Sequence, residues 1–164
     1  MTDSDFEKQI LRYKKKLYRF ALSILKQKED AQDAVQEVVL RMWKKRELLN
    51  SKENFESYCM NSIKNYALDL LRKRRNLQNY KESTPAGNIA PEEFENKDII
   101  EKMQLFLKQL PVQQRMAIEL KDFQGYEYEE ISTMLEISVN AARVNVSRGR
   151  KRLYEKFKEE ISNG

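Results

Sequence analysis

The sequence predicts an all-α protein made of two small helical domains joined by a flexible linker, the second domain carrying a helix-turn-helix. Three observations predict it. Apolar residues recur every three or four positions along most of the 164-residue chain, which is the period of helices packed on one face. No long β-branched run alternates with period two. Between residues 77 and 97 the apolar period is lost, and two of the three prolines fall there among polar residues, as in a linker.

Three helices are expected in the first domain, residues 1–76. In the first helix the apolar residues step by three or four: Phe6, Ile10, Tyr13, Leu17, Phe20 and Ile24. Asp30 is the expected N-cap of the second, DAQDAVQEVVLRMWKK, whose acidic first turn suits the helix dipole. The third, FESYCMNSIKNYALDLLRKRR, ends in four consecutive cations. Its apolar stripe, with both tyrosines expected in the core, is Phe55, Tyr58, Cys59, Ile63, Tyr66 and Leu70.

The second domain, expected at residues 98–164, ends in a helix-turn-helix pattern. Its first helix has the apolar face Ile99, Met103, Phe106 and Leu110, and Pro111 can start the next helix because its missing N–H is not needed there. YEEISTML then holds about two turns, and EIS leaves a short turn before Ser138 caps a longer helix. A short helix, a tight turn and a longer helix form this motif.

The longer helix contains ISVNAARVNVSRGRKRL, in which small apolar residues alternate with cations. If Ala142, Val146, Gly149 and Leu153 pack inward, the outward residues are Asn140, Arg143, Val144, Ser147, Arg148 and Lys151. Arginine pairs with guanine, asparagine with adenine, and apolar groups with the thymine methyl. Cations farther along, Arg150, Lys151 and Arg152, are expected to hold phosphates. These residues alone leave open a solvated basic face or, less favoured, a membrane-surface helix.

Composition narrows the function classes. The chain has 31 Lys and Arg against 26 Asp and Glu, a net charge of +5, which favours a polyanionic partner. It has no His and one Cys, so we expect no disulfide, no metal and no cofactor. Without His or a glycine-rich phosphate loop, an enzyme with catalytic residues is disfavoured. No apolar run spans a bilayer and the N-terminus lacks signal-peptide features, so we expect a cytoplasmic protein without membrane insertion.

Three segments, in order, resemble the extracytoplasmic-function (ECF) sigma factors, the compact branch of the sigma-70 family. EDAQDAVQEVVLRMW resembles the acidic segment of that family's first domain, and FESYCMNSIKNYALDLLRKRR resembles its promoter-melting segment. LPVQQRMAIELKDFQGYEYEEISTMLEISVNAARVNVSRGRKRL resembles its second-domain helix-turn-helix. The resemblance implies a non-enzymatic protein that binds core RNA polymerase, directs it to promoter DNA and helps open the duplex.

The resemblance also implies roles for particular residues. Polymerase contacts would come from Asp33, Gln36 and Glu37. A loop before the melting helix would capture a base flipped from the −10 element, aided by the cations Lys44, Lys45, Arg46 and Lys52. In the melting helix the matching residues are Asn65, Arg72 and Arg74. The helix-turn-helix would read the −35 element. An anti-sigma factor is an implied partner, and the free protein is expected to be a monomer.

The sequence departs from the family pattern at three positions. Glu136 stands where the family favours Gly in the turn, Ala142 where it often has Val, and Tyr58 where it often has Trp. A positive φ at Glu136 would cost ~1 kcal/mol relative to glycine. Two other functions stay open at this point: a stand-alone helix-turn-helix regulator with a helical dimerisation module, and an RNA-binding or adaptor protein. A dimeric regulator would bind palindromic duplex DNA without polymerase.

Overall fold

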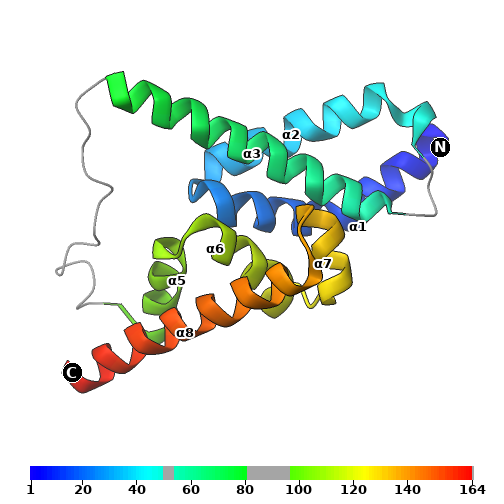
Figure 1. The fold of residues 1–164 in the computed structure, drawn as a ribbon. Coiled ribbons are helices and arrows are strands. Elements are labelled where there is room, and N and C mark those ends of the chain that lie inside the picture. Colours follow the sequence, from blue (N-terminus) through cyan, green and yellow to red (C-terminus); the bar gives the residue numbers. More distant parts are fainter. Residues whose placement is uncertain (50–53, 81–96, 164) are drawn as a thin grey trace.

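The computed structural model describes residues 1–49, 54–80 and 97–163, and every regular element in them is helical (Figure 1). The prediction of an all-α fold is therefore confirmed. In the first domain the elements are α1 (Asp3–Leu25), α2 (Lys28–Lys44), the short 3-10 turn η1 (Arg46–Leu48) and α3 (Phe55–Tyr80). In the second they are α5 (Ile99–Gln109), α6 (Val112–Ile118), the π-helical turn η2 (Glu119–Phe123), α7 (Tyr128–Leu135) and α8 (Val139–Asn163).

The first domain is a three-helix unit in which α1, α2 and α3 contact one another. The predicted apolar face of α1 is buried, with Leu17, Phe20 and Ile24 fully enclosed. Thr2 caps α1 by accepting a hydrogen bond from the Asp5 N–H at 3.1 Å. The helix ends where Lys26 adopts a left-handed φ of 67°, which lets its N–H donate to the carbonyl of Leu22 and turns the chain into α2.

The start of α2 differs from the expectation. Asp30 is not its N-cap, because the helix begins two residues earlier, at Lys28, with Gln27 at the capping position. Asp30 instead lies in the first turn and accepts two hydrogen bonds from the guanidinium of Arg74 on α3, at 2.7 and 2.9 Å. This bidentate pair holds the pKa of the Asp30 carboxyl below its usual range. Asp30 therefore ties α2 to α3 rather than starting a helix.

The second domain is built around α8, which α5, α6 and α7 all contact. A reciprocal capping box of Glu127 and Glu130 starts α7. The predicted apolar face of α5 is only half correct: Phe106 and Leu110 are buried, but Ile99 and Met103 are 65% and 44% exposed. The contacts of α5 are mainly with α8, and this packing leaves Ile99 and Met103 exposed.

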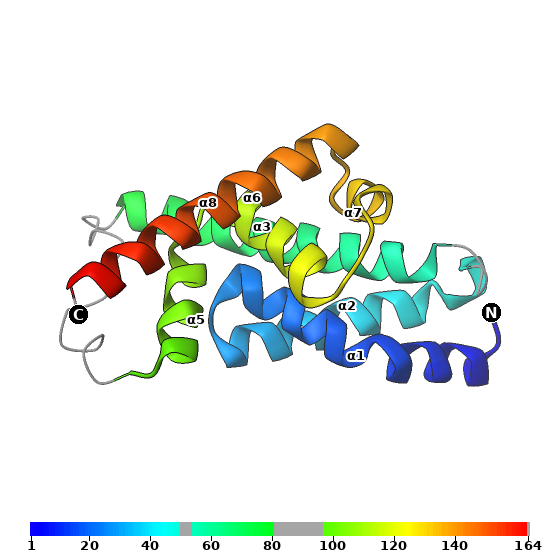
Figure 2. The ribbon, with the colours of Figure 1, turned by 90° about the horizontal axis from the view of Figure 1, so that it is seen from below.

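The two domains pack against each other (Figures 1 and 2). α3 lies against α7, and α1 lies against α6. One buried apolar cluster continues from Phe20 and Ile63 of the first domain to Met116 and Ile131 of the second. No helix in the described part of the chain is long and apolar enough to cross a membrane.

The domain limits can be compared with the structure only in part. α3 continues to Tyr80, so the first four residues of the segment expected as a linker, 77–80, are helical. Lys97 and Asp98 precede α5, whose N-terminus Asp98 caps by accepting from the Glu101 N–H at 2.8 Å. The rest of the expected linker, residues 81–96 with Pro85, Gly87 and Pro91, lies outside the described residues.

Candidate nucleic-acid interface

The helix-turn-helix is formed by α7, a turn of three residues and α8. Glu136 takes the left-handed conformation, with φ 55° and ψ 46°, at the position where glycine would be unstrained. The turn is closed by the N–H of Ile137 donating to the carbonyl of Ser132 at 3.1 Å, and the Ser132 hydroxyl donates to the carbonyl of Ile137. Ser138 caps α8 as predicted, its Oγ accepting from the Ala141 N–H at 3.0 Å.

The inner face of α8 is the one that the sequence predicted. Ala142 and Val146 are fully buried, and Leu153 is partly buried. Gly149 lies so close to α6 that a Cβ there would overlap with Cδ1 of Ile118. Small residues therefore let α8 cross the domain at short range, which fixes the direction of its opposite face.

The outer face of α8 carries the residues predicted to contact DNA. Val144 is half-buried, and the other five are exposed: Asn140, Arg143, Ser147, Arg148 and Lys151. The guanidinium Cζ of Arg143 lies 5.4 Å from the ring centroid of Tyr128 on α7. The outward position of these six residues is compatible with DNA contact, and DNA contact stays a prediction for each of the six.

Arg150 differs from the expectation that it is a free phosphate ligand. Its Nε donates to Oδ2 of Asp122 at 3.0 Å, and a second bond joins the same two groups. The hydrogen bond that Arg150 donates to Asp122 raises the pKa of Arg150. Arg150 therefore holds α8 to the π-helical turn η2. Lys151 and Arg152 remain exposed.

In the first domain a surface hollow lies between the end of α2 and the middle of α3. Tyr58 is 41% exposed in it, so the prediction of Tyr58 as a core residue is wrong. Tyr66 is partly buried and has the guanidinium of Arg41 at 5.4 Å from its ring centroid. The hollow is lined by these three residues and by Val38, Met42, Lys45, Ser62, Lys64, Asn65, Leu68, Asp69, Leu70, Arg72 and Lys73.

Three of the predicted −10 residues line this hollow: Lys45, Asn65 and Arg72. Asn65 donates to the Asn61 side chain at 3.0 Å, and Arg72 pairs with Asp69 at 3.1 Å. Lys44 is exposed outside the hollow.

Two other predicted −10 cations have partners elsewhere. Arg46 donates to Asp3 at 2.6 Å and stacks on the Trp43 ring at 3.8 Å. Arg74 is held by Asp30. Both cations therefore tie the first domain together, and contact with DNA would require them to leave these partners. Lys52 lies outside the described residues.

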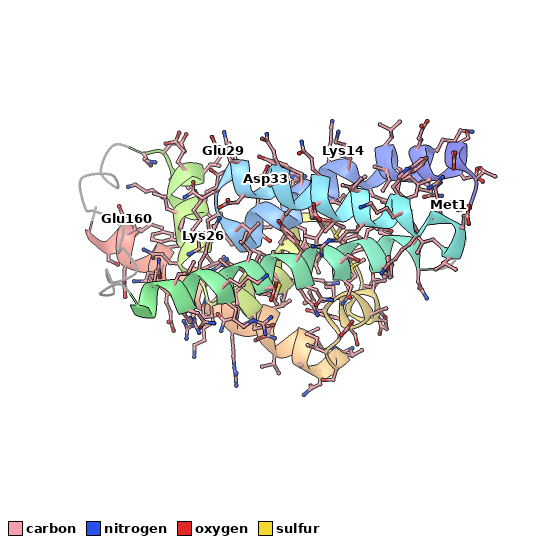
Figure 3. The ribbon with its side chains drawn as sticks, turned by 90° about the horizontal axis from the view of Figure 1, so that it is seen from above. Met1, Lys14, Lys26, Glu29, Asp33 and Glu160 are labelled. Atoms are coloured by element: carbon pink, nitrogen blue, oxygen red, sulfur yellow. The ribbon has the colours of Figure 1, made fainter. Side chains whose placement is uncertain are left out.

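The predicted polymerase-binding residues lie along α2. Asp33 and Gln36 are exposed, whereas Glu37 is partly buried and accepts from Nε of Arg41 at 3.0 Å. In Figure 3, Asp33 projects outward from α2 on the side away from α8, with Glu29 one turn before it. Gln36 lines a shallow hollow shared with α1.

Polar side chains from α3 reach across to the second domain. Nδ2 of Asn61 donates to the carbonyl of Met134 at 3.0 Å, and Nζ of Lys64 donates to the carbonyl of Leu135 at 2.9 Å. Both carbonyls lie in the last turn of α7, where a helix leaves its carbonyls without internal partners. Burial lowers the pKa of Lys64. The first domain thus caps the first helix of the helix-turn-helix.

The second domain does the same for α1. The guanidinium of Arg115 on α6 donates to the carbonyl of Ser23 at 2.6 Å and to that of Ile24 at 3.0 Å, both near the end of α1. It also donates to Leu110 of its own domain at 2.6 Å. Burial lowers its pKa to about 10. We call the contacts of Asn61, Lys64 and Arg115 with these carbonyls the interdomain seam.

Sequence reasoning missed the three residues of the seam. Arg115 lies in an ordinary amphipathic pattern, and Lys64 directly follows the core residue Ile63. Their partners are backbone carbonyls of the other domain, and no side-chain pattern marks a carbonyl as an acceptor. Knowledge of how the domains dock was needed to find them.

Comparison with known proteins identifies both domains. The protein family described as "Sigma-70 region 2" matches residues 10–77, and the family described as "Sigma-70, region 4" matches residues 100–153. The chain is 29% identical over 146 residues to the ECF RNA polymerase sigma factor SigE of Mycolicibacterium smegmatis, covering 84% of this chain and 56% of that protein. It is 30% identical over 105 residues to the RNA polymerase sigma factor SigZ of Bacillus subtilis, covering 64% of this chain and 60% of that protein.

A solved structure agrees over almost the whole chain. The sigma factor RpoE of Bartonella quintana, in complex with the anti-sigma factor NepR, superimposes with a TM-score of 0.78 at 26% identity, covering 94% of this chain and 97% of that one. The chain thus spans less than two thirds of the two curated relatives, 56% and 60%, but nearly all of the solved one. The chain belongs to the sigma-70 family, in its ECF group.

Proposed function

We propose that the protein is an initiation factor that binds core RNA polymerase, directs it to specific promoters and helps to open the duplex. The observation that carries the proposal is the exposed outer face of α8, which presents Arg143 and Arg148 while the inner face of the same helix is buried. The family membership of both domains supports it. In this role the protein has no catalytic activity of its own and works in the cytoplasm, where polymerase and chromosome meet.

The two domains divide the promoter between them. Residues 98–164 read the −35 element, with α8 in the major groove and α7 bracing it. Base contacts come from the residues nearest the start of α8, and each good bidentate pair discriminates by about 1–3 kcal/mol. Lys151, farther along the helix, holds a phosphate. The proposed −35 contacts are Asn140, Arg143, Val144, Ser147, Arg148 and Lys151.

Residues 1–76 act on the −10 element, with residues 77–97 as the connection. The hollow beside Tyr58 and Tyr66 offers an aromatic surface next to the cations Arg41 and Lys45. Flipping a base costs a few kcal/mol, and stacking on an aromatic ring returns about 1–3 kcal/mol. The proposed −10 contacts are Lys44, Lys45, Arg46, Lys52, Asn65, Arg72 and Arg74, and the polymerase contacts are Asp33, Gln36 and Glu37.

We include an anti-sigma factor among the partners, because the sigma factor RpoE of Bartonella quintana was solved in complex with one. We propose that the free protein is a monomer, because one continuous apolar cluster is closed by packing between its own two domains.

Reconstitution tests the proposal. The purified protein is added to core RNA polymerase, and initiation is measured on a library of duplex promoters with randomised upstream and downstream elements. We expect initiation at a defined subset that needs both components. A folded protein and an active core that together initiate nowhere would refute the proposal. Binding to palindromic duplex without polymerase would identify a stand-alone regulator, and preference for RNA or single strands an RNA-binding protein.

Single substitutions in α8 test the assignment of roles within the same assay. Arg143→Ala and Arg148→Ala each relax the preference at one base pair of the upstream element. Lys151→Ala weakens binding to all sequences and reduces the salt dependence, because a phosphate contact carries no sequence information. Equal losses on every sequence from all three variants would contradict the proposed facing of α8.

A further inference from the structure

The ring of Tyr128, at the start of the helix-turn-helix, lies near one cation of η2 and one of α8. Tyr128 is the first residue of α7 and is partly buried. The Nζ of Lys121 lies 4.5 Å from its ring centroid, and the Cζ of Arg143 lies 5.4 Å from it. Both distances are within the range in which a ring face attracts a cation.

We infer that Tyr128 is a positioning residue that orients the guanidinium of Arg143 for reading the −35 element. The inference rests on the proposed function and deepens it. A bidentate contact with guanine needs both N–H donors of the fork in one plane at one place. An exposed arginine otherwise loses rotamer freedom when DNA fixes it in one geometry. A ring that already restrains Arg143 before DNA arrives reduces that loss.

The neighbouring carboxylates Asp122 and Glu127 are each paired with a cation other than Arg143. Asp122 of η2 already has both carboxylate oxygens on the Arg150 guanidinium. Glu127, the acidic neighbour of Lys121, pairs with that lysine at 3.9 Å. No carboxylate among the described residues forms an ion pair with Arg143. The guanidinium of Arg143 therefore lies against the uncharged ring of Tyr128, and no ion pair in the described part of the chain has to be broken before it binds DNA.

Arg148 provides an internal comparison. It lies on the same exposed face of α8, and within the described part of the chain it has neither a ring contact nor an ion pair. If the ring positions Arg143, a change at Tyr128 affects the base pair that Arg143 reads and leaves the base pair that Arg148 reads unchanged. A change that only loosens the domain affects both.

The test uses the full chain bound to core polymerase and duplex promoters varied one base pair at a time across the upstream element. Arg143→Ala and Arg148→Ala first define which base pair each arginine reads. Tyr128→Leu, which keeps apolar bulk but removes the ring, is then expected to reduce discrimination about two- to fivefold at the Arg143 base pair alone. Tyr128→Phe, which keeps the ring, is expected to retain the wild-type discrimination.

A double-mutant cycle completes the test. In an Arg143→Ala background, Tyr128→Leu should cause no further loss, because the interaction is already absent. A Tyr128→Leu effect that is uniform over all sequences, equal at the Arg148 base pair or undiminished in that background would overturn the inference. If Tyr128→Leu binds too little core polymerase to assay, a Tyr128→Phe variant with reduced discrimination at the Arg143 base pair would overturn it as well.

The failure of the inference is distinguishable from the failure of the proposed function. If Arg143→Ala changes no base preference, then Arg143 is not a reader, and the proposed role of α8 fails whatever Tyr128 does. If Arg143→Ala relaxes one position but Tyr128→Leu does not, the reader role stands and the positioning role falls.

Discussion

The interdomain seam and the outer face of α8 use the same kinds of side chain for opposite purposes. Arg115 is 8% exposed, and its guanidinium is satisfied by three carbonyls. Arg148 is exposed on α8 with no ion pair in the described part of the chain. Lys64 and Lys151 differ in the same way: one donates to the end of α7, the other faces solvent. A cation's role is therefore set by the partners that the fold supplies, not by its charge.

The largest expected loss of stability is at Arg115, the buried cation of the interdomain seam. Arg115→Met keeps most of the apolar stem but leaves the carbonyls of Ser23, Ile24 and Leu110 without their donor in a buried place. Unsatisfied buried groups cost about 1–3 kcal/mol each, and water relieves part of this, so we expect the free energy of unfolding to fall by about 3 kcal/mol. Urea denaturation followed by circular dichroism measures it.

The matched control for Arg115→Met is Arg148→Met on the exposed face. We expect it to change the free energy of unfolding by less than ~0.5 kcal/mol. If the two variants lost equal stability, the distinction between the seam and the outer face would be wrong.

A smaller effect is expected at Lys64. Lys64→Met removes the bond to the carbonyl of Leu135, but it also removes a cation whose pKa burial has lowered. The two changes oppose each other, so we expect a net loss of about 1 kcal/mol. Hydrogen exchange should show faster exchange near the end of α7. Lys151→Met, with an exposed lysine, should leave those amides unchanged, and protection that is equal in both variants would argue against the cap.

Gly149 tests the close packing of the inner face of α8 against α6. Gly149→Ala adds a Cβ that overlaps with Ile118, a residue only 1% exposed. Overpacking costs about 1–3 kcal/mol and alanine regains up to about 1 kcal/mol of helix propensity, so we expect a net loss of about 1 kcal/mol. Ile118→Val removes the overlapping methyl and should restore part of the stability of the alanine variant. Additive losses in the double variant would contradict this account.

The smallest expected effect is a gain at the turn. Glu136→Gly relieves the left-handed conformation at φ 55°, which is worth ~1 kcal/mol. The greater freedom of glycine in the unfolded chain offsets part of this gain, so we expect a net stabilisation of ~0.5 kcal/mol. Gly125→Ala is the opposite control: Gly125 has φ +77° with open space around it, so alanine there should destabilise through the backbone alone. Thermal unfolding of both variants measures the two signs.

Much of the fold could be predicted from sequence because periodicity reports which face of a helix is buried. The inner face of α8 and the Ser138 cap follow from local pattern and local backbone chemistry, whereas the left-handed turn at Glu136 agrees with the glycine that the family pattern favours there. The outward position of Arg143 then follows from the inward position of Ala142 and Val146. These features lie within a few residues of the signals that predict them.

Features that depend on docking could not be predicted in the same way. Tyr58 has the spacing of a core residue, but it is exposed because none of the described helices covers that side of α3. Ile99 and Met103 continue the stripe of α5, but the packing of α5 against α8 leaves them exposed. Asp30 resembles a cap, but its position is fixed by Arg74, which lies 44 residues away. In each case a second element, distant in sequence, decides the outcome.

The seam has a consequence for the apparent affinity of the protein for promoters. Lys64 on α3 touches the last turn of α7, next to the start of α8, whereas the −10 and −35 elements are by their numbering about 25 base pairs apart, or ~85 Å of duplex at ~3.4 Å per base pair. In the proposed function, only molecules whose seam has opened can engage both elements. The apparent dissociation constant is the intrinsic one divided by the open fraction. A seam change that raised the open fraction tenfold would therefore tighten promoter binding tenfold without altering a single DNA contact.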